Sequence, residues 1–355
     1  MSNPWAAWLG QYDTDRFILS RKQGWDKFVN TAPRPDFDTL TRAQMAALGA
    51  EELEDYNQAR KVWNANLPTV KTLQVQAAFG IINQVMASNH RDGDKLRGSV
   101  VIDAKPGLGK TTTAAQYGKE FHREQYRRYG AETPDGHQRL PVMFLSLSAG
   151  ITLKGLNQKM LEFYGHPAAS RASRTQLGSL AVDCVLGCAT RVIVIDDLHF
   201  IDFTHRNGLE VSNHLKWLAN EMPATFIFVG VGLEQKEFFN EGLYGENAVY
   251  AQTGRRATPC PLVPFNIESG PGFRAWVGLL ELLEGHIKLA DARPGILTNH
   301  ASTLHHRTQG YIGSLTSLIE RLCHVAIVTG HETIDESILA RAITDSAAQR
   351  GSATA

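Results

Sequence analysis

The chain has 355 residues, of which 43% are apolar and 20% are charged, so it can bury a sizeable core and is not intrinsically disordered. Its 36 Lys and Arg balance its 36 Asp and Glu, so any surface that binds nucleic acid must be local. The apolar runs are far shorter than the ~20 residues that cross a bilayer, and no secretory signal is visible. These features predict a cytoplasmic protein without a membrane partner.

The first 66 residues are rich in Trp and charge and predict an N-terminal extension with a helical run over residues 41–63. Trp5, Trp8 and Trp25 either form a surface that binds a partner or anchor the extension to the rest of the chain. A further helix is expected over residues 68–88.

From residue 98 onwards, short apolar segments alternate with helical patterns. Strands are predicted over residues 98–103, 141–147, 191–195 and 224–231, with a fifth over residues 260–265. The helices between them are predicted over residues 111–129, 154–164, 175–188 and 209–220. Continuous apolar strands that alternate with helices are typical of a parallel sheet covered on both faces, so residues 67–265 are expected to form an α/β core with five parallel strands.

No strand pattern follows residue 265. Helices are predicted over residues 273–289, 301–308, 312–329 and 334–346. Residues 266–355 are therefore expected to form a helical lid and a C-terminal tail.

The turn between the first predicted strand and its helix fits the phosphate-binding P-loop pattern, with Ala104 in the place of the first Gly. Its residues are Ala104, Lys105, Pro106, Gly107, Leu108, Gly109, Lys110 and Thr111, and Thr112 follows in the helix. The glycines allow backbone N–H groups to surround phosphate oxygens at a helix N-terminus. Lys110 is expected to reach the outer phosphates of ATP, and the Thr111 hydroxyl to bind Mg²⁺. The alternative is a Gly-rich turn that binds nothing.

The strand over residues 191–195 ends in Asp196 and Asp197. Such a pair suits a second, Walker B site, in which Asp196 holds the Mg²⁺ through water and Asp197 orients or deprotonates the attacking water. Asp197 is shorter than the Glu that is usual at this position. We therefore expect an ATPase with slow hydrolysis.

The order of these parts resembles the AAA+ ATPases, and several segments resemble the TniB/TnsC regulators of DNA transposition. The most discriminating is the helix over residues 211–221 with Asn213, Lys216 and Asn220, which leads into the strand that ends in Val229-Gly230. Residues 56–63 and 151–161 are similar to two further helices of that family. The resemblance covers roughly residues 50–345.

The resemblance implies that Arg255 or Arg256 acts as an arginine finger on a neighbouring subunit's nucleotide. The protein would then be an oligomer, either a hexameric or heptameric ring or a helical filament. The alternative is a surface turn with two solvated arginines. Two departures point to a switch more than a motor: Val231 replaces the polar residue that senses the γ-phosphate, and no Arg occupies the sensing position in the lid.

The resemblance also implies that double-stranded DNA runs along the inner face of the oligomer and contacts Thr152 and Lys154, with Lys159, Arg171 and Arg174 nearby. Lysines at such spacing also occur on solvated helix faces. The implied partners are an integrase-like transposase and a target-selection protein. The rival functions are a STAND-type signalling or defence switch that does not bind DNA, and a P-loop kinase for a small molecule.

Overall fold

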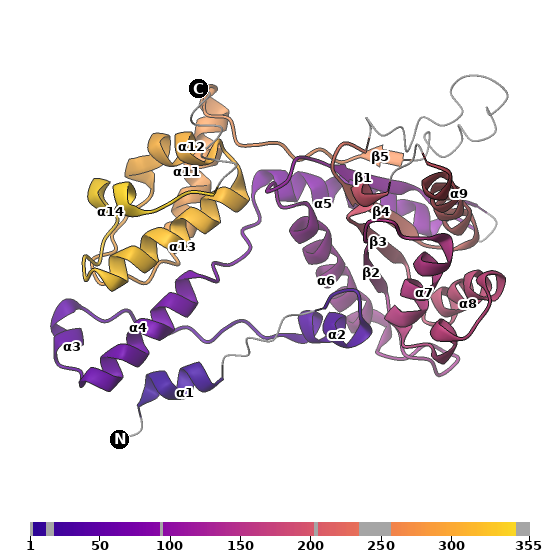
Figure 1. Cartoon of the computed structure of the whole chain (residues 1–355), viewed down its shortest axis with the longest axis horizontal. Coiled ribbons are helices and arrows are strands. Elements are labelled where there is room, and N and C mark those ends of the chain that lie inside the picture. Colours follow the sequence, from indigo (N-terminus) through magenta and orange to yellow (C-terminus); the bar gives the residue numbers. More distant parts are fainter. Residues whose placement is uncertain (1–2, 12–17, 93–94, 202–204, 234–256, 346–355) are drawn as a thin grey trace. The chain divides into compact units, whose positions relative to one another are not determined.

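The computed structural model describes residues 3–11, 18–92, 95–201, 205–233 and 257–345. The chain divides into two compact units, both drawn in Figure 1. We call one the sheet unit, made of Arg16–Ala32 and Gln74–Val263, and the other the helical unit, made of Met1–Asp15, Pro33–Leu73 and Pro264–Ala355.

The sheet unit contains five parallel strands in the order β2-β3-β4-β1-β5, which confirms the predicted fold class. The strands are β1 (Ser99–Asp103), β2 (Val142–Ser146), β3 (Val192–Asp196), β4 (Thr225–Gly230) and β5 (Ala257–Pro259). Nearly every residue of β1 to β4 is buried, which explains their uninterrupted apolar sequences. Asp103 pairs with Gly230, and Ser146 with Asp196, so these polar strand ends lie on one edge of the sheet.

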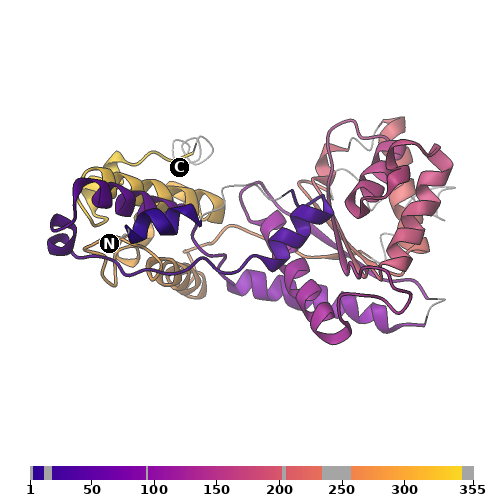
Figure 2. The same cartoon turned by 90° about the horizontal axis from the view of Figure 1, so that it is seen from below.

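Helices cover both faces of this sheet. The connection from β1 to β2 runs in one direction along the strand order. The connections from β2 to β3 and from β3 to β4 run in the opposite direction. Because such crossovers are right-handed, α6 lies on one face, and α7, α8 and α9 lie on the other (Figures 1 and 2). The helices are α2 (Lys22–Asn30), α5 (Leu73–Met86), η1 (Ala87–His90), α6 (Lys110–Tyr129), α7 (Leu153–Tyr164), η2 (Pro167–Ser170), α8 (Arg174–Gly187), η3 (Leu198–Phe200) and α9 (Arg206–Glu221).

The fifth strand was predicted in the wrong place. It covers Ala257–Pro259, and residues 260–265 contain no strand. The Cys260 amide still donates to the Val101 carbonyl oxygen at 2.7 Å, but Pro261 has no N–H to continue the pairing.

The helical unit has an apolar core of its own, in which the Trp276 indole N–H donates to the Ala301 carbonyl oxygen at 2.9 Å. Its helices are α1 (Pro4–Gly10), α3 (Arg42–Ala46), α4 (Ala50–Asn64), α11 (Gly270–Glu284), η5 (Thr298–His300), α12 (Ala301–Thr308), α13 (Ile312–Val328) and α14 (Glu336–Arg341). The α12 bounds equal the predicted ones, whereas α11 ends earlier than predicted, at Glu284. None of the helices in the described ranges is long and apolar enough to cross a membrane.

The predicted extension over residues 1–66 is not one structural segment, because it contributes to both units. Trp25 is fully buried in the sheet unit, where its indole N–H donates to His122 Nδ1 at 3.1 Å and its ring stacks on Phe144. Of the two alternatives for the tryptophans, Trp25 therefore fits the one in which it anchors the N-terminal segment to the rest of the chain. The predicted helical run over residues 41–63 is two helices, α3 and α4, and both belong to the helical unit.

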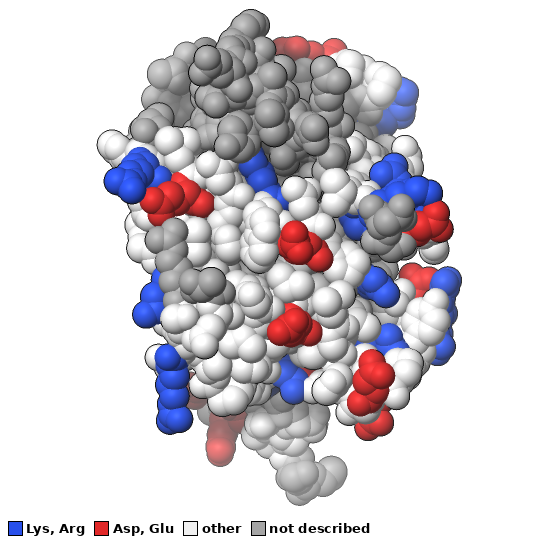
Figure 3. All heavy atoms as spheres, turned by 90° about the vertical axis from the view of Figure 1, so that its right-hand side faces the viewer, with Lys and Arg blue, Asp and Glu red and all other residues white. Residues whose placement is uncertain are grey.

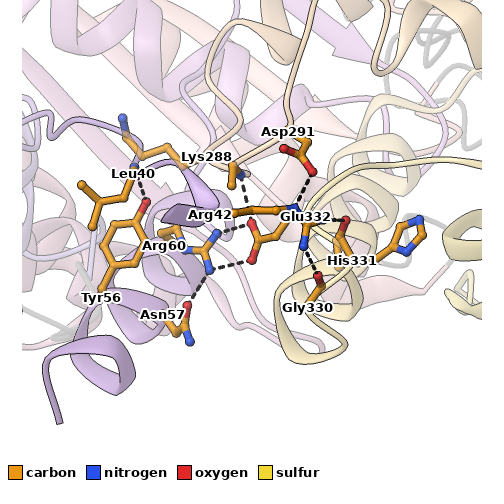
Figure 4. A network of polar contacts seen from close by, with 12 residues as sticks. Leu40, Arg42, Tyr56, Asn57, Arg60, Lys288, Asp291, Gly330, His331 and Glu332 are labelled. Carbon is orange, nitrogen blue, oxygen red and sulfur yellow. Dashed lines mark hydrogen bonds and ion pairs between the residues drawn. The ribbon is translucent and has the colours of Figure 1, made fainter. Parts of the chain in front are cut away.

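Helix α4 is fastened to the C-terminal part of the helical unit by a polar network (Figure 4). The buried Arg60 guanidinium contacts both carboxylate oxygens of the buried Glu332, at 2.5 and 3.0 Å. Nearby, Arg42 bonds to Asp291 at 2.7 Å, and the Tyr56 hydroxyl accepts from the Leu40 amide at 2.8 Å.

Candidate nucleotide-binding site

The predicted P-loop joins the end of β1 to the start of α6. Gly107 and Gly109 have φ angles of 79° and 80°, in the left-handed region that a residue with a side chain rarely adopts. Gly109 is the N-cap of α6, and the helix begins at Lys110. The first N–H groups of a helix have no partner within it, so this loop offers donors to an anion at the positive end of α6.

Ala104 stands where the pattern usually has Gly. Its backbone is not among the residues with positive φ, so a side chain is tolerated there without strain. The Ala104 amide donates to the Gly230 carbonyl oxygen at 3.3 Å, and its side chain is buried. Lys105, Pro106 and Gly107 are exposed, and Leu108 anchors the loop in the interior.

Lys110 lies beneath this loop, with its ammonium group donating to the Lys105 carbonyl oxygen at 2.9 Å. Only 9% of the residue is exposed, and burial lowers the pKa of its ammonium group. The carboxylates of Asp196, Asp103 and Asp197 oppose this shift, which shows that the lysine lies among the acids at the strand ends. A phosphate group at the loop would give the ammonium a counterion.

Asp196 and Thr111, the two expected Mg²⁺ ligands, are brought together. Asp196 is 4% exposed, and burial raises the pKa of its carboxyl, while a hydrogen bond from Thr111 opposes that rise. Among the described residues, no group of three or more His, Cys, Asp or Glu is placed to hold a metal ion. One carboxylate and one hydroxyl nevertheless fit Mg²⁺ that arrives with a nucleotide, because that ion takes most of its other ligands from water and phosphate.

Asp197 has a left-handed backbone, with φ of 60°, and its amide donates to Asp196 Oδ1 at 2.8 Å. The Ser146 hydroxyl donates to Asp197 Oδ2 at 2.7 Å and fixes the direction of that carboxylate. Ser146 was not predicted as a site residue. A signal was present, because Ser146 is the polar residue one position before the end of the strand predicted over residues 141–147, and the next predicted strand is followed directly by the two acids.

The remaining predicted site residues are the two candidate arginine fingers and the candidate DNA contacts. Arg255 and Arg256 lie outside the described residues. Thr152 is the N-cap of α7, its hydroxyl accepts from the Gly155 amide at 3.1 Å, and Lys154 is exposed in the first turn of that helix. Lys159, which was expected nearby, lies in the same helix and donates to the Ser146 carbonyl oxygen at 3.2 Å.

The face of the sheet unit on the side of α8 carries scattered charges. Among the described residues of this face, Figure 3 shows positive and negative side chains separated by uncharged ones. Strand β4 ends at Gly230, and beyond Val231 the Gly232 amide donates to Asp103 Oδ1 at 2.7 Å.

Comparisons with known proteins agree with this geometry. Residues 92–236 match the family described as AAA domain, and no curated protein matches the chain. Three solved structures are similar in fold: Orc1 of Aeropyrum pernix in complex with DNA (TM-score 0.56, 17% identity), Orc2 of the same organism in its ADP form (0.51, 14%) and Cdc6p of Pyrobaculum aerophilum (0.50, 13%).

The three alignments include 82%, 75% and 76% of this chain. They include 69%, 66% and 66% of the three solved proteins. At these identities the likeness shows the fold alone. With the parallel sheet and the P-loop, it shows that the chain has the AAA+ P-loop fold, and residues 92–236 of this fold match the AAA domain family.

Proposed function

We propose that the protein is an ATP-dependent, DNA-binding AAA+ regulator of DNA transposition, which assembles on duplex DNA and recruits or activates a transposase. The observation that carries the nucleotide-dependent part is the meeting of Lys110, Thr111, Asp196 and Asp197 at one edge of the sheet. Those four groups are the ones that binding and hydrolysis of ATP require.

In this proposal, Lys110 leaves the Lys105 carbonyl and pairs with the outer phosphates, and Thr111 and Asp196 hold the Mg²⁺. The ion would neutralise charge on the transferred phosphoryl group. Asp197 orients the attacking water, and Ser146 keeps its carboxylate in place. Arg255 or Arg256 would complete the site of a neighbouring subunit, which makes hydrolysis dependent on assembly.

The DNA-dependent part rests on the resemblance of the helix over residues 211–221, which is part of α9, to the transposition regulators. The similarity in fold to an Orc1 protein solved with DNA is compatible with it. Thr152 and Lys154 are the proposed contacts with DNA phosphates, and both are exposed at the start of α7. The proposed protein partners are further copies of the chain, an integrase-like transposase and a target-selection protein.

The test is binding of the full chain to labelled duplex DNA with ATP, with ADP and with a non-hydrolysable ATP analogue, over a series of salt concentrations. We expect binding only with the triphosphates, a steep loss with salt and no binding by Lys110→Ala. Lys154→Ala should weaken binding to DNA and leave ATP binding unchanged, whereas Arg274→Ala, at an exposed arginine of the helical unit, serves as a control.

If the chain binds ATP tightly but ignores DNA in every nucleotide state, the transposition proposal fails, and a protein-binding switch of the STAND type replaces it. Transfer of phosphate to a small acceptor would instead identify a kinase.

A further inference from the structure

Three arginines lie at the edge of the sheet that is opposite the P-loop. Arg97 precedes β1 by two residues, Arg139 precedes β2 by three, and Arg191 directly precedes β3. Because the amino ends of parallel strands meet at one edge, the fold gathers these three cations there. The nucleotide-binding site uses none of them.

Two hollows open at this edge, and Ala87 in η1 lines both of them. One has a volume of about 590 Å³ and is lined in part by Arg128, Tyr129, Arg139 and Arg191. The other, of about 860 Å³, is lined in part by Arg97. Both volumes lie in the range of pockets that hold small ligands.

Backbone carbonyl groups are the hydrogen-bond acceptors for Arg97 and Arg191. Arg97 Nη1 donates to the Ser88 and Arg91 carbonyl oxygens, both at 2.8 Å, and its Nε is buried without a hydrogen-bond partner. Arg97 is 9% exposed, so water does not readily supply the missing acceptor. Arg191 Nη1 makes a long contact of 3.3 Å to the Pro223 carbonyl oxygen.

Arg139 is also bonded to the backbone, through the Gly130 and Glu132 carbonyl oxygens at 3.0 and 2.9 Å. Within the described residues, none of the three arginines forms an ion pair with a carboxylate. Glu124, the acid that lines the same hollow, is already paired with Arg128 at 2.6 Å. The cluster therefore has an excess of positive charge.

The electrostatic cost of this arrangement is visible at Arg191. Burial lowers the pKa of its guanidinium, and repulsion from Arg97 and Arg139 lowers it further. The positive charges are thus close enough to destabilise one another, and an anion bound among them would relieve the repulsion.

The chemistry of the hollow favours phosphate. A planar guanidinium group can donate two parallel hydrogen bonds to two oxygens of one phosphate. An aromatic surface lies beside them, because Tyr129 is 59% exposed and the Arg139 guanidinium carbon lies 5.5 Å from its ring centre. Exposed aromatic rings next to arginines are also suited to stacking with nucleobases.

We propose that the hollow between η1, the end of α6 and the amino ends of β2 and β3 is a second anion site, which binds the phosphate of a nucleotide. The nucleotide is either a free small molecule or the terminal residue of a single nucleic-acid strand. The site is separate from the P-loop and does not depend on the function proposed above.

The test uses the full chain with its P-loop saturated by ADP and Mg²⁺. Inorganic phosphate, uridine monophosphate and a 5′-phosphorylated hexathymidylate are titrated by calorimetry, and thermal unfolding is recorded with each. We expect one further site per chain and a rise in the melting temperature. Tighter binding of the monophosphate identifies a free nucleotide, and tighter binding of the oligonucleotide identifies a nucleic-acid end.

Arg191→Gln should weaken the binding of these probes at least about tenfold, because it removes a charge-assisted contact. Without any anion it should be no less stable than the wild type, because it also removes repulsion. Arg139→Gln is the second variant, and Arg274→Gln, at an exposed arginine of the helical unit, is the matched control. Absence of a second site in the wild type, or equal binding by wild type and both Gln variants, overturns the proposal.

Discussion

At the scale of single residues, the Asp197 carboxylate is positioned by its own backbone and by one hydroxyl. Its left-handed φ is tolerated by Asp and Asn better than by most residues, and Ser146 holds the carboxylate at 2.7 Å. Asp197→Asn therefore keeps the backbone and removes only the charge. We expect hydrolysis to fall by roughly 10²-fold or more, while nucleotide affinity changes little, as measured by single-turnover hydrolysis and equilibrium binding.

A matched variant of the same pair is Ser146→Ala, which leaves the carboxylate charged but less well oriented. Its loss of hydrolysis should be smaller than that of Asp197→Asn. Unchanged turnover in Asp197→Asn would show that another group activates the water.

His122 gives the sheet unit a pH-dependent contribution to stability. It is 1% exposed and accepts a hydrogen bond from Trp25 at Nδ1, and burial lowers its pKa from 6.5 to about 4. The unfolded chain therefore binds the proton more readily, so this stability is complete above pH 6.5 and is lost as the pH falls towards 4. Between pH 7.5 and pH 5 the loss should be about 2 kcal/mol.

The measurement is urea unfolding at both pH values for the wild type and for His122→Gln, which cannot gain a proton. The variant should lack this part of the pH dependence. Equal pH dependence in the two proteins would mean that His122 is not held neutral in the folded state.

At the scale of elements, α4 depends on the buried pair between Arg60 and Glu332, which are 1% and 3% exposed. Glu332 adopts a positive φ of 62°, and its carboxylate also accepts from the Ala290 amide at 2.9 Å. Glu332→Gln keeps the shape and leaves Arg60 buried without its counterion. We expect it to lower the free energy of unfolding by about 3–5 kcal/mol.

The control lies in the same network (Figure 4). Asp291→Asn breaks an exposed ion pair with Arg42, which keeps its bonds to the Gly330 and His331 carbonyl oxygens. That change should cost at most about 1 kcal/mol. Similar costs in the two variants would contradict a special role for the buried pair.

The elements that could be predicted are those whose signal is local. Runs such as Val192 to Ile195 are apolar throughout because both faces of the strand are covered, and the P-loop glycines mark the strand-to-helix turn. The fifth strand was predicted too late in the chain because the apolar residues lie after β5 and not within it. Pro259 and Pro261 limit the strand pairing to a short segment.

Non-local contacts could not be predicted. Nothing near Trp25 in the sequence reveals that it packs against His122 and Phe144, and Arg60 meets a carboxylate 272 positions away. The cluster of Arg97, Arg139 and Arg191 depends in addition on which strands are neighbours in the sheet, and periodicity does not give this order.

At the scale of the whole molecule, each unit is assembled from segments that are distant in the sequence. The first 66 residues supply α2, with Trp25, to the sheet unit, and α1, α3 and α4 to the helical unit. An accessory extension would be dispensable for folding, but this segment completes two cores. We therefore expect deletion of residues 1–66 to destabilise both units, because it exposes the surfaces that Trp25 and α4 cover.

Deletion of residues 3–10 alone is the appropriate comparison, since it removes α1, which has no fully buried residue. Hydrogen exchange of the two truncated chains would follow β2 and α6 as reporters of the sheet unit and α13 as the reporter of the helical unit. Loss of protection in all three elements after the long deletion, with native protection after the short one, is the expected result. If the long deletion leaves β2 and α6 protected, the stability of the sheet unit does not depend on α2, and the first 66 residues act as an accessory segment for that unit after all.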